Sequence, residues 1–201
     1  MIICVTNRLL CRGDFLTRLE GIAAARPWGI LLREKDLAAA EYATLALACS
    51  AVCQRYQTRL LVHSHPALAA QLPSRWLHLP FPLLEREKRG GLRASVSVHS
   101  AEEAVRAEAG GAHCLVAGHI FSTACKPGLP PRGIEFLRAV CQSVSIPVFA
   151  IGGMSADRVP EVIGAGAAGI CVMSELMTCP DPGNRIREYK RRIGEAREEY
   201  Q

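Results

Sequence analysis

The residues with the clearest potential for chemistry lie at 118–126, in the stretch GHIFSTACK. It follows the apolar run at 113–118 directly, and it contains His119, Thr123 and Lys126. The Pro and Gly residues that come next suit a turn, but a turn needs neither a histidine nor a lysine. A neutral imidazole can take or give a proton near pH 7 without a large pKa shift. We therefore expect His119 to be the catalytic residue, with a hydrogen-bonded loop histidine as the alternative.

Two short turns predict a phosphate site. Gly153 ends the apolar segment at 146–153, and Met173 and Ser174 end the segment at 169–174. Bare backbone N–H groups at the start of a helix favour an anion, and the loops after the last two strands of an eight-stranded barrel commonly bind phosphate. Two ordinary glycine turns are the alternative, but the occurrence of both features together favours phosphate binding.

Three cations extend the expected site. Arg33 and Lys35 end an apolar run, and alternate residues of a strand point to the same side, so both can point into one mouth. Lys126 adds a third positive charge, which suits a substrate with more than one negative group. Solvent-facing charge around Glu34 is the alternative. Ser97 ends another apolar run and is also expected to bind substrate.

The histidines raise the question of a metal site. His63, His65, His78 and His113 are candidate zinc ligands, but no acidic or cysteine ligand pattern accompanies them. A His-x-His pair at a strand end usually divides between two faces. His113 begins its strand, at the opposite end from the expected site, and His78 is more typical of a satisfied core histidine. We expect neither a metal nor a cofactor.

The elements that would position these residues alternate regularly. Helical patterns separate short apolar runs that have the continuous character of strands buried on both faces. The runs are residues 2–6, 29–33, 59–63, 75–79, 94–98, 113–118, 146–153 and 169–174. Asp14 and the pair Ser100/Glu103 are expected helix N-caps, the pair as a capping box. Residues 80–91 are expected to form a turn of helix or a loop. Eight strands predict an α/β fold, a single small (β/α)8 TIM barrel over residues 1–201, rather than an open doubly wound sheet.

Composition limits the class of protein. The chain has 201 residues, of which 49% are hydrophobic and 21% charged, so it can bury a large core. It has no run that would span a membrane, and its start resembles a first strand rather than a signal peptide. The nine cysteines show no CxxC pair and suit reduced thiols in a cytoplasmic protein. A net charge of +5 with 5% aromatic residues does not favour nucleic-acid binding.

Four segments together carry a resemblance to a known family. They are LLREK (31–35), residues 95–133 around GHIFSTACK, IPVFAIGGM (146–154) and GAAGICVMS (166–174). In this order they resemble the thiamine phosphate synthase superfamily, whose members are small (β/α)8 barrels. The resemblance covers most of the chain.

The synthase branch of that superfamily joins a pyrimidine diphosphate to thiazole phosphate with the help of magnesium. Its pattern has Gln, Asn-Asp and Asp where this chain has Leu31, then His63 and Ser64, and then Leu83. Both aspartates that would hold magnesium are therefore missing, which argues against synthase activity.

The thiazole tautomerase (TenI) branch is similar in having Gly-His and a Cys before the Lys. This resemblance implies an isomerase of thiamine biosynthesis that aromatises a thiazole phosphate carboxylate by proton transfer at His119. The substrate-binding residues would be Arg33, Lys35, Ser97, Thr123, Lys126, Gly153, Met173 and Ser174. A thiamine phosphate synthase, or a non-catalytic thiazole or thiamine phosphate-binding protein, is the alternative. The oligomeric state stays open, including a homodimer.

Overall fold

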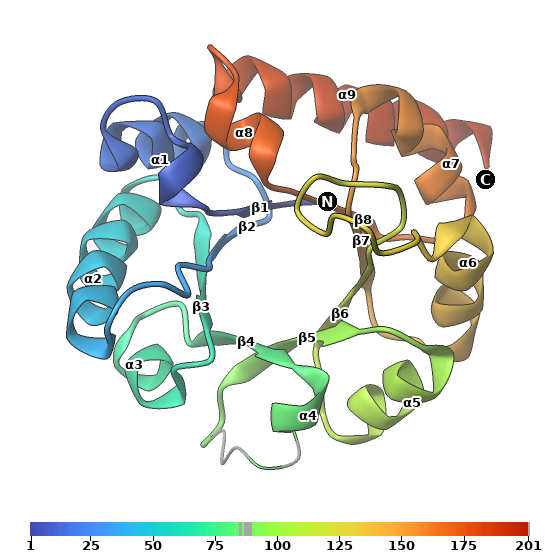
Figure 1. The fold of residues 1–201 in the computed structure, drawn as a ribbon, viewed down its shortest axis with the longest axis horizontal. Helices are drawn as coiled ribbons and strands as arrows, with labels where there is room; N and C mark the ends of the chain where they lie inside the picture. The colour runs from blue at the N-terminus through green and yellow to red at the C-terminus, as the bar shows by residue number, and fades with distance from the viewer. Residues whose placement is uncertain (85, 87–89, 201) are drawn as a thin grey trace.

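Eight parallel strands form a closed barrel in the computed structural model of this chain, which describes residues 1–84, 86 and 90–200 (Figure 1). Neighbours in the sequence are neighbours in the sheet, and the last strand pairs with the first. The strands are β1 Ile2–Val5, β2 Gly29–Leu32, β3 Arg59–His63, β4 Trp76–Pro80, β5 Arg93–Val98, β6 Cys114–Gly118, β7 Val148–Ile151 and β8 Gly169–Val172. The TIM-barrel prediction is confirmed.

Helices surround the barrel, and α9 packs beside α1 and α7 on the outside of the ring (Figure 1). The α-helices are α1 Phe15–Ala24, α2 Ala39–Arg55, α3 Pro66–Gln71, α4 Phe81–Leu84, α5 Ala101–Ala109, α6 Gly133–Ser143, α7 Val159–Gly164, α8 Ser174–Thr178 and α9 Pro182–Glu199. Two 3-10 helices are η1 Arg8–Leu10 and η2 Ala156–Arg158. Of the turn or loop expected at 80–91, α4 is the helical part, and residues 85 and 87–89 lie outside the described chain.

The predicted helix caps form, with one difference. The carboxylate of Asp14 accepts a hydrogen bond from the backbone N–H of Thr17 at 2.7 Å. The hydroxyl of Ser100 accepts one from the N–H of Glu103 at 3.1 Å. The Glu103 carboxylate does not return a bond to Ser100 but accepts the N–H of His99 at 2.7 Å. The predicted capping box is therefore only half formed, because Glu103 secures the residue before the cap.

Successive strand residues divide between two cores, as the two-residue period of a strand requires. One set, which includes Ile2, Cys4 and Ile30, packs under the helices. The other set fills the barrel interior: Ile3, Val5, Leu31, Leu61, Trp76, Cys114, Val116, Phe149 and Cys171. Side chains rather than a pore therefore occupy the barrel axis, as is usual for this fold.

Aromatic rings close the amino-terminal end of the barrel. The ring of Trp28 lies 5.0 Å from that of Trp76 and 5.1 Å from that of Phe149, measured between centroids. The Trp28–Trp76 pair is edge-on, a geometry that stabilises aromatic pairs beyond the area they bury, and the Trp28–Phe149 pair is tilted. The larger cavity of the described chain therefore opens toward the carboxyl ends of the strands.

Two further predictions concern the chain as a whole. All nine cysteines are free thiols, and five of them are buried, as expected for small hydrophobic residues: Cys4, Cys49, Cys53, Cys114 and Cys171. Within the described residues, no helix combines the length and apolar character needed to cross a membrane.

Candidate active site

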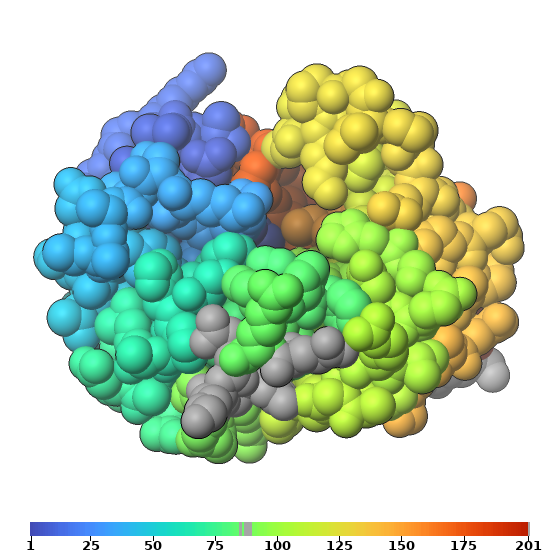
Figure 2. Space-filling model, turned by 60° about the horizontal axis from the view of Figure 1, so that its bottom comes forward, coloured from blue at the N-terminus to red at the C-terminus, as the bar shows by residue number. Residues whose placement is uncertain are grey.

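A cavity of about 630 Å³ opens at the carboxyl ends of the strands. Figure 2 shows the opening between residues near 35 and the loop after β6. The nine residues predicted to form the site all line this cavity: Arg33, Lys35, Ser97, His119, Thr123, Lys126, Gly153, Met173 and Ser174. The structure thus places them together, and their individual roles stay predictions.

His119 lies at the end of β6 and is only 5% exposed. Its Nε2 is 3.3 Å from the carbonyl oxygen of Leu129, which secures one side of the ring to the following loop. Its Nδ1 is buried and has no hydrogen-bond partner. Buried polar atoms are rarely left unsatisfied, and an exception points to a group that binds there. The His119 ring therefore lines the cavity with one nitrogen that is enclosed and unpaired.

The two glycines after β7 have a packing role that the sequence did not reveal. A Cβ on Gly152 would lie 2.3 Å from the Cβ of His119, and one on Gly153 would lie 2.6 Å from the carbonyl oxygen of Ser122. Both also adopt positive φ angles, +103° and +65°, where other residues are strained. Close contact with the loop after β6 is therefore enough to require these glycines, whether or not an anion binds.

The turns after β7 and β8 nonetheless present free donors to the cavity. No described atom accepts a hydrogen bond from the backbone N–H of Gly153 or Ser174. The hydroxyl of Ser174 lies 3.5 Å from the Cys125 thiol across the opening. These donors can bind an anion such as a phosphate, since an N–H without an internal partner needs an external acceptor.

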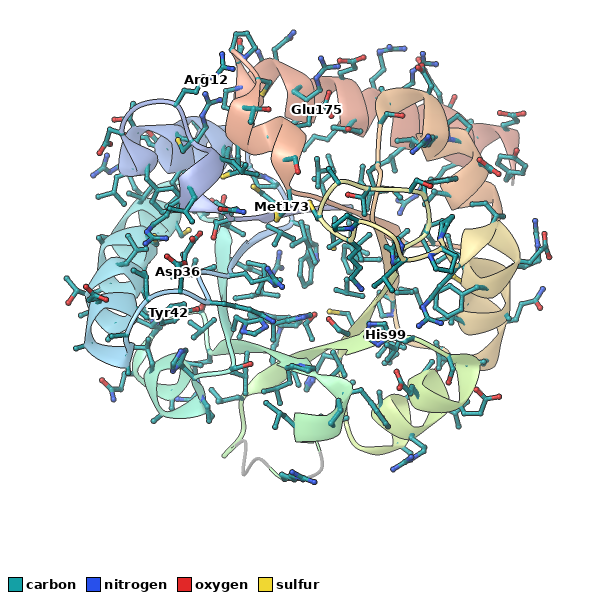
Figure 3. The ribbon with its side chains drawn as sticks, viewed as in Figure 1. Arg12, Asp36, Tyr42, His99, Met173 and Glu175 are labelled. Atoms are coloured by element: carbon teal, nitrogen blue, oxygen red, sulfur yellow. The ribbon has the colours of Figure 1, made fainter. Side chains whose placement is uncertain are left out.

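Glu175 is a site residue that the sequence analysis missed. It lines the cavity directly after Ser174 on α8, and Figure 3 shows it with Met173 on this side of the barrel. Its carboxylate pairs with Arg185 of α9, with 3.1 Å between Nε and Oε1, and it accepts a hydrogen bond from the hydroxyl of Tyr189. A negative charge beside a phosphate site would repel the ligand, and Arg185 offsets that charge. The position of Glu175 at a helix start was the available signal.

The cations at the end of β2 form a positive edge with Lys126 from the loop after β6. The positive charge of Arg33 is the largest cause that lowers the pKa of Lys35, followed by partial burial and by Lys126. Like charges destabilise one another's charged forms only when they are close and poorly screened. Arg33, Lys35 and Lys126 therefore create a concentrated positive field at one side of the cavity.

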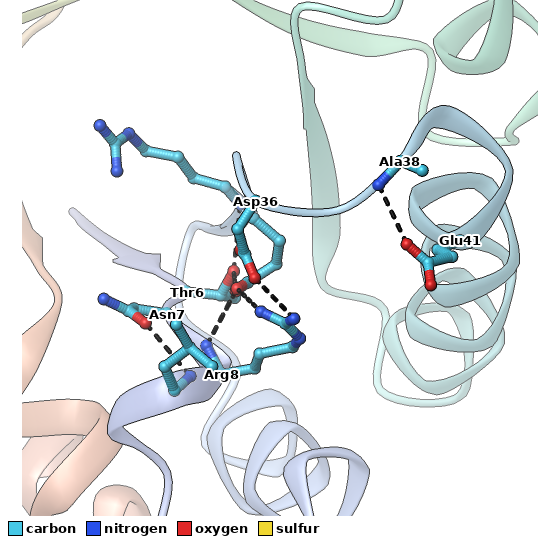
Figure 4. Close-up of polar contacts among 9 residues, drawn as sticks. Thr6, Asn7, Arg8, Asp36, Ala38 and Glu41 are labelled. Atoms are coloured by element: carbon cyan, nitrogen blue, oxygen red, sulfur yellow. Dashed lines mark hydrogen bonds and ion pairs between the residues drawn. The ribbon is translucent and has the colours of Figure 1, made fainter.

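The acidic neighbours of Lys35 in the sequence turn away from this edge, toward Arg8 (Figure 4). Glu34 is 4% exposed and accepts a hydrogen bond from Thr6 Oγ1 at 2.6 Å. It also accepts the backbone N–H of Arg8 at 3.0 Å. The Asp36 carboxylate lies 2.6 Å from the Arg8 guanidinium, which lowers the pKa of Asp36. Both carboxylates are thus occupied outside the cavity.

Neutral histidines form the wall between the positive edge and β5. The His78 ring lies between the hydroxyls of Ser95 and Ser97, each 2.9 Å from a ring nitrogen. Burial is the largest cause that lowers the pKa of His78 to about 3 and that of His63 to about 4, and the nearby charge of Arg33 is a smaller part of both shifts. Near neutral pH both rings are therefore uncharged, so they contribute hydrogen bonds rather than charge.

The other polar residues considered at strand ends lie elsewhere. The ring of His65 stacks on Tyr42 with 4.4 Å between centroids, so the His-x-His pair does divide between two faces. His113 lies beside Trp76 at the amino-terminal end of the barrel, as predicted. Leu83 is partly buried against the outer core on α4. These residues do not line the cavity.

Apolar residues form the inner surface of the cavity, and the sequence analysis did not predict them as site residues. They are Val5, Leu31, Val116, Ile151 and Cys171. Their strands were predicted, so the alternation of inward residues could have identified them. An apolar floor with a few polar groups around it is typical of small-molecule sites.

The available donors do not suit the magnesium ion that the family resemblance implies. Mg²⁺ prefers octahedral oxygen coordination that includes carboxylates. Glu175 is the only carboxylate among the described residues of the lining, and Arg185 and Tyr189 already occupy it. The described residues contain no group of three His, Cys, Asp or Glu side chains that could hold a metal. The positive edge would also repel a cation.

Comparison with known proteins gives a consistent result. A thiamine-phosphate synthase of Moorella thermoacetica is 30% identical, covering 97% of this chain and 96% of its own length. One from Coprothermobacter proteolyticus is 33% identical over 88% of this chain and 87% of its own length. The solved thiamine phosphate pyrophosphorylase of Pyrococcus furiosus matches with a TM-score of 0.84 and 26% identity, covering 97% and 96% of the two chains.

These names correct one prediction. The relatives are named as synthases and a pyrophosphorylase, and none of these three is named as an isomerase. The assignment as an isomerase, a thiazole tautomerase, is therefore wrong, and the proton transfer given to His119 loses its basis. It rested on the Gly-His pair and the Cys before Lys126, and His119 is held by packing against Gly152 whatever the reaction.

The profile of one family matches most of the chain. The description of that profile is thiamine monophosphate synthase, and the match covers residues 2–176, from β1 to α8. This extent includes all eight strands and every residue predicted to form the site. The chain belongs to the thiamine monophosphate synthase family.

Proposed function

We propose that this chain is a thiamine-phosphate synthase that joins a pyrimidine diphosphate to thiazole phosphate in the cavity at the carboxyl ends of the strands. The observation that supports this most is the match to relatives of that name over nearly the whole of both chains. The cavity adds chemical support, because it combines two kinds of anion-binding edge with an apolar floor.

In this proposal the thiazole phosphate binds at the turns after β7 and β8. The phosphate accepts hydrogen bonds from the backbone N–H groups of Gly153 and Ser174, which lack internal acceptors. Met173 and the apolar floor contact the ring, and Thr123 lies at the rim. Neutral backbone donors can bind the phosphate on this side, because the charges of Glu175 and Arg185 offset each other there.

The diphosphate of the second substrate lies at the positive edge. Joining the two halves forms a bond from the thiazole nitrogen to the pyrimidine methylene carbon, and the bond from that carbon to the diphosphate oxygen breaks. The diphosphate leaves with the electron pair, so negative charge grows on its oxygens. Arg33, Lys35 and Lys126 are placed to stabilise that charge, which lowers the barrier only if they bind it more strongly as it develops.

His119 acts in this proposal as a substrate contact. Its buried Nδ1 lacks a partner, and its ring lines the cavity beside Gly152. Ser97, held by the neutral ring of His78, is a further hydrogen-bonding residue of the pyrimidine side.

The test is direct synthesis. The purified protein is incubated with the pyrimidine diphosphate and thiazole phosphate, and thiamine phosphate is measured by chromatography, with Mg²⁺ in one series and EDTA in the other. Product that increases with time and protein supports the proposal. No product in either series, from folded protein that binds thiazole phosphate, would overturn it.

The residues that line the cavity favour one second candidate function. With no free carboxylate among the described lining residues, the protein could bind thiazole or thiamine phosphate without converting it. Saturable binding of thiazole phosphate by calorimetry, with no product in the synthesis assay, would identify this function.

A further inference from the structure

Arg8 pairs with both acidic residues that flank Lys35 in the sequence, and Thr6 adds one more hydrogen bond to Glu34. Arg8 pairs through its guanidinium with Asp36 at 2.6 Å and with Glu34 at 3.6 Å. Its backbone N–H also donates a hydrogen bond to Glu34, at 3.0 and 3.1 Å from the two carboxylate oxygens. Glu34 and Asp36 flank Lys35 in the sequence, so without Arg8 they would be the nearest counter-charges for that lysine.

The cations of the edge are correspondingly unpaired. Among the described residues, no carboxylate lies within ion-pair distance of Arg33, Lys35 or Lys126. All three line the cavity, and they come from two different loops. Lys35 and Lys126 are 91 residues apart in the sequence (126 minus 35). Grouping like charges is unfavourable, so an arrangement that keeps them together without acids indicates a polyanionic ligand.

We propose that the cavity binds the diphosphate group directly through Arg33, Lys35 and Lys126, without a divalent metal ion. This rests on the proposed function for the identity of the anion as a diphosphate. Guanidinium and ammonium groups form charge-assisted hydrogen bonds to phosphate oxygens, and several of them together supply the charge that a metal ion would otherwise bring. The neutral rings of His63 and His78 beside the edge add no competing negative charge.

Arg8 is the positioning residue of this arrangement. It does not line the cavity, and it acts by holding Glu34 and Asp36 away from the three cations. A site for Mg²⁺ would need carboxylate ligands, and the two family positions that would supply them are Ser64 and Leu83 here. Glu34 and Asp36 do not replace them, because both are turned toward Arg8, and the edge remains positive.

The test is binding of inorganic pyrophosphate by isothermal titration calorimetry, once in EDTA and once in excess Mg²⁺. The affinity in EDTA should equal or exceed that in Mg²⁺, because Mg²⁺ chelates free pyrophosphate and competes with the protein cations. Lys35→Ala and Lys126→Ala should each weaken binding in EDTA about tenfold or more, as expected for the loss of a charge-assisted bond. Arg12→Ala is the matched control, since Arg12 is exposed, outside the cavity lining, and should bind like the wild type.

A second measurement tests Arg8. Arg8→Ala should weaken pyrophosphate binding in EDTA several-fold, and the double variant Arg8→Ala/Asp36→Asn should recover part of the loss, which a general loss of folding would not do. Binding that disappears in EDTA, or that is unchanged in both lysine variants, would overturn the inference. Because no turnover is measured, these results are separate from the synthesis assay: a protein that binds pyrophosphate without metal but forms no thiamine phosphate contradicts the proposed function alone.

Discussion

The contact between Gly152 and His119 allows a quantitative prediction about how the loops of the site are held together. In Gly152→Ala the new Cβ would lie 2.3 Å from the Cβ and 2.8 Å from the Cα of His119. Both atoms belong to the rigid part of the residue, so no side-chain rotation can relieve the overlap. The end of β7 and the loop after β6 would have to separate.

The cost has two parts. The φ of Gly152 is +103°, and a non-glycine residue in such a region costs about 1–3 kcal/mol. Overpacking against a fixed neighbour adds about 1–3 kcal/mol. Gly13→Ala separates the two, because Gly13 has a φ of +98° and nothing within 4 Å of its Cβ position. We expect Gly13→Ala to show the first loss alone and Gly152→Ala to show both.

Urea unfolding followed by circular dichroism measures the free energy of unfolding of both variants. The expected gap between them is about 1–3 kcal/mol. Calorimetry with thiazole phosphate should also show weaker binding for Gly152→Ala, since His119 moves, while Gly13→Ala keeps the wild-type affinity. Equal losses of stability in the two variants would refute the idea that contact with His119 requires this glycine.

Three other predictions follow from the same structure. The pKa of His63 is lowered from 6.5 to about 4, so as the pH drops the unfolded chain binds the proton before the folded chain does. The free energy of unfolding therefore falls as the pH drops from 6.5 to 4. His63→Gln should reduce that fall by up to about 3 kcal/mol, as measured by urea unfolding across this pH range. Phe149→Ala should lose about 3–5 kcal/mol in the same assay at pH 7, because it empties the buried centre of the barrel next to Trp28, and a smaller loss would mean that the floor rearranges. Arg185→Ala should raise the Kd for thiazole phosphate several-fold by leaving Glu175 uncompensated, and adding Glu175→Gln should restore it; no recovery would contradict this account of the pair.

The barrel and the location of its site were predictable because both follow from short-range patterns. A strand buried on both faces is apolar at successive positions, and Ile2–Val5 and Gly169–Val172 are buried throughout, so their ends were visible in the sequence. The carboxyl ends of parallel strands meet at one end of a barrel, which is why His119 and Ser174, 55 residues apart by subtraction, could be assigned to one site.

Contacts between distant residues were not predictable in the same way. The pairing of Arg8 with Glu34 and Asp36 joins the loops after β1 and β2, and no local pattern in either segment indicates it. The same applies to Glu175, whose partner Arg185 lies on another helix. The free donors after β7 suit a phosphate, but Gly152 and Gly153 are also required by packing against the loop after β6, and one sequence pattern cannot separate these two causes.

The function depends on contacts between distant residues, which a sequence pattern does not reveal. A histidine after β6 and a lysine in the same loop are compatible with several reactions, and reading them as an isomerase site gave the wrong class. What distinguishes the cavity is its charge: three cations on one edge, two neutral imidazoles beside them and acids paired elsewhere. Such a cavity attracts anions and repels metal ions, whether or not the protein then joins two phosphorylated substrates. Affinity for pyrophosphate in EDTA therefore tests the chemistry of the site, and formation of thiamine phosphate tests its use.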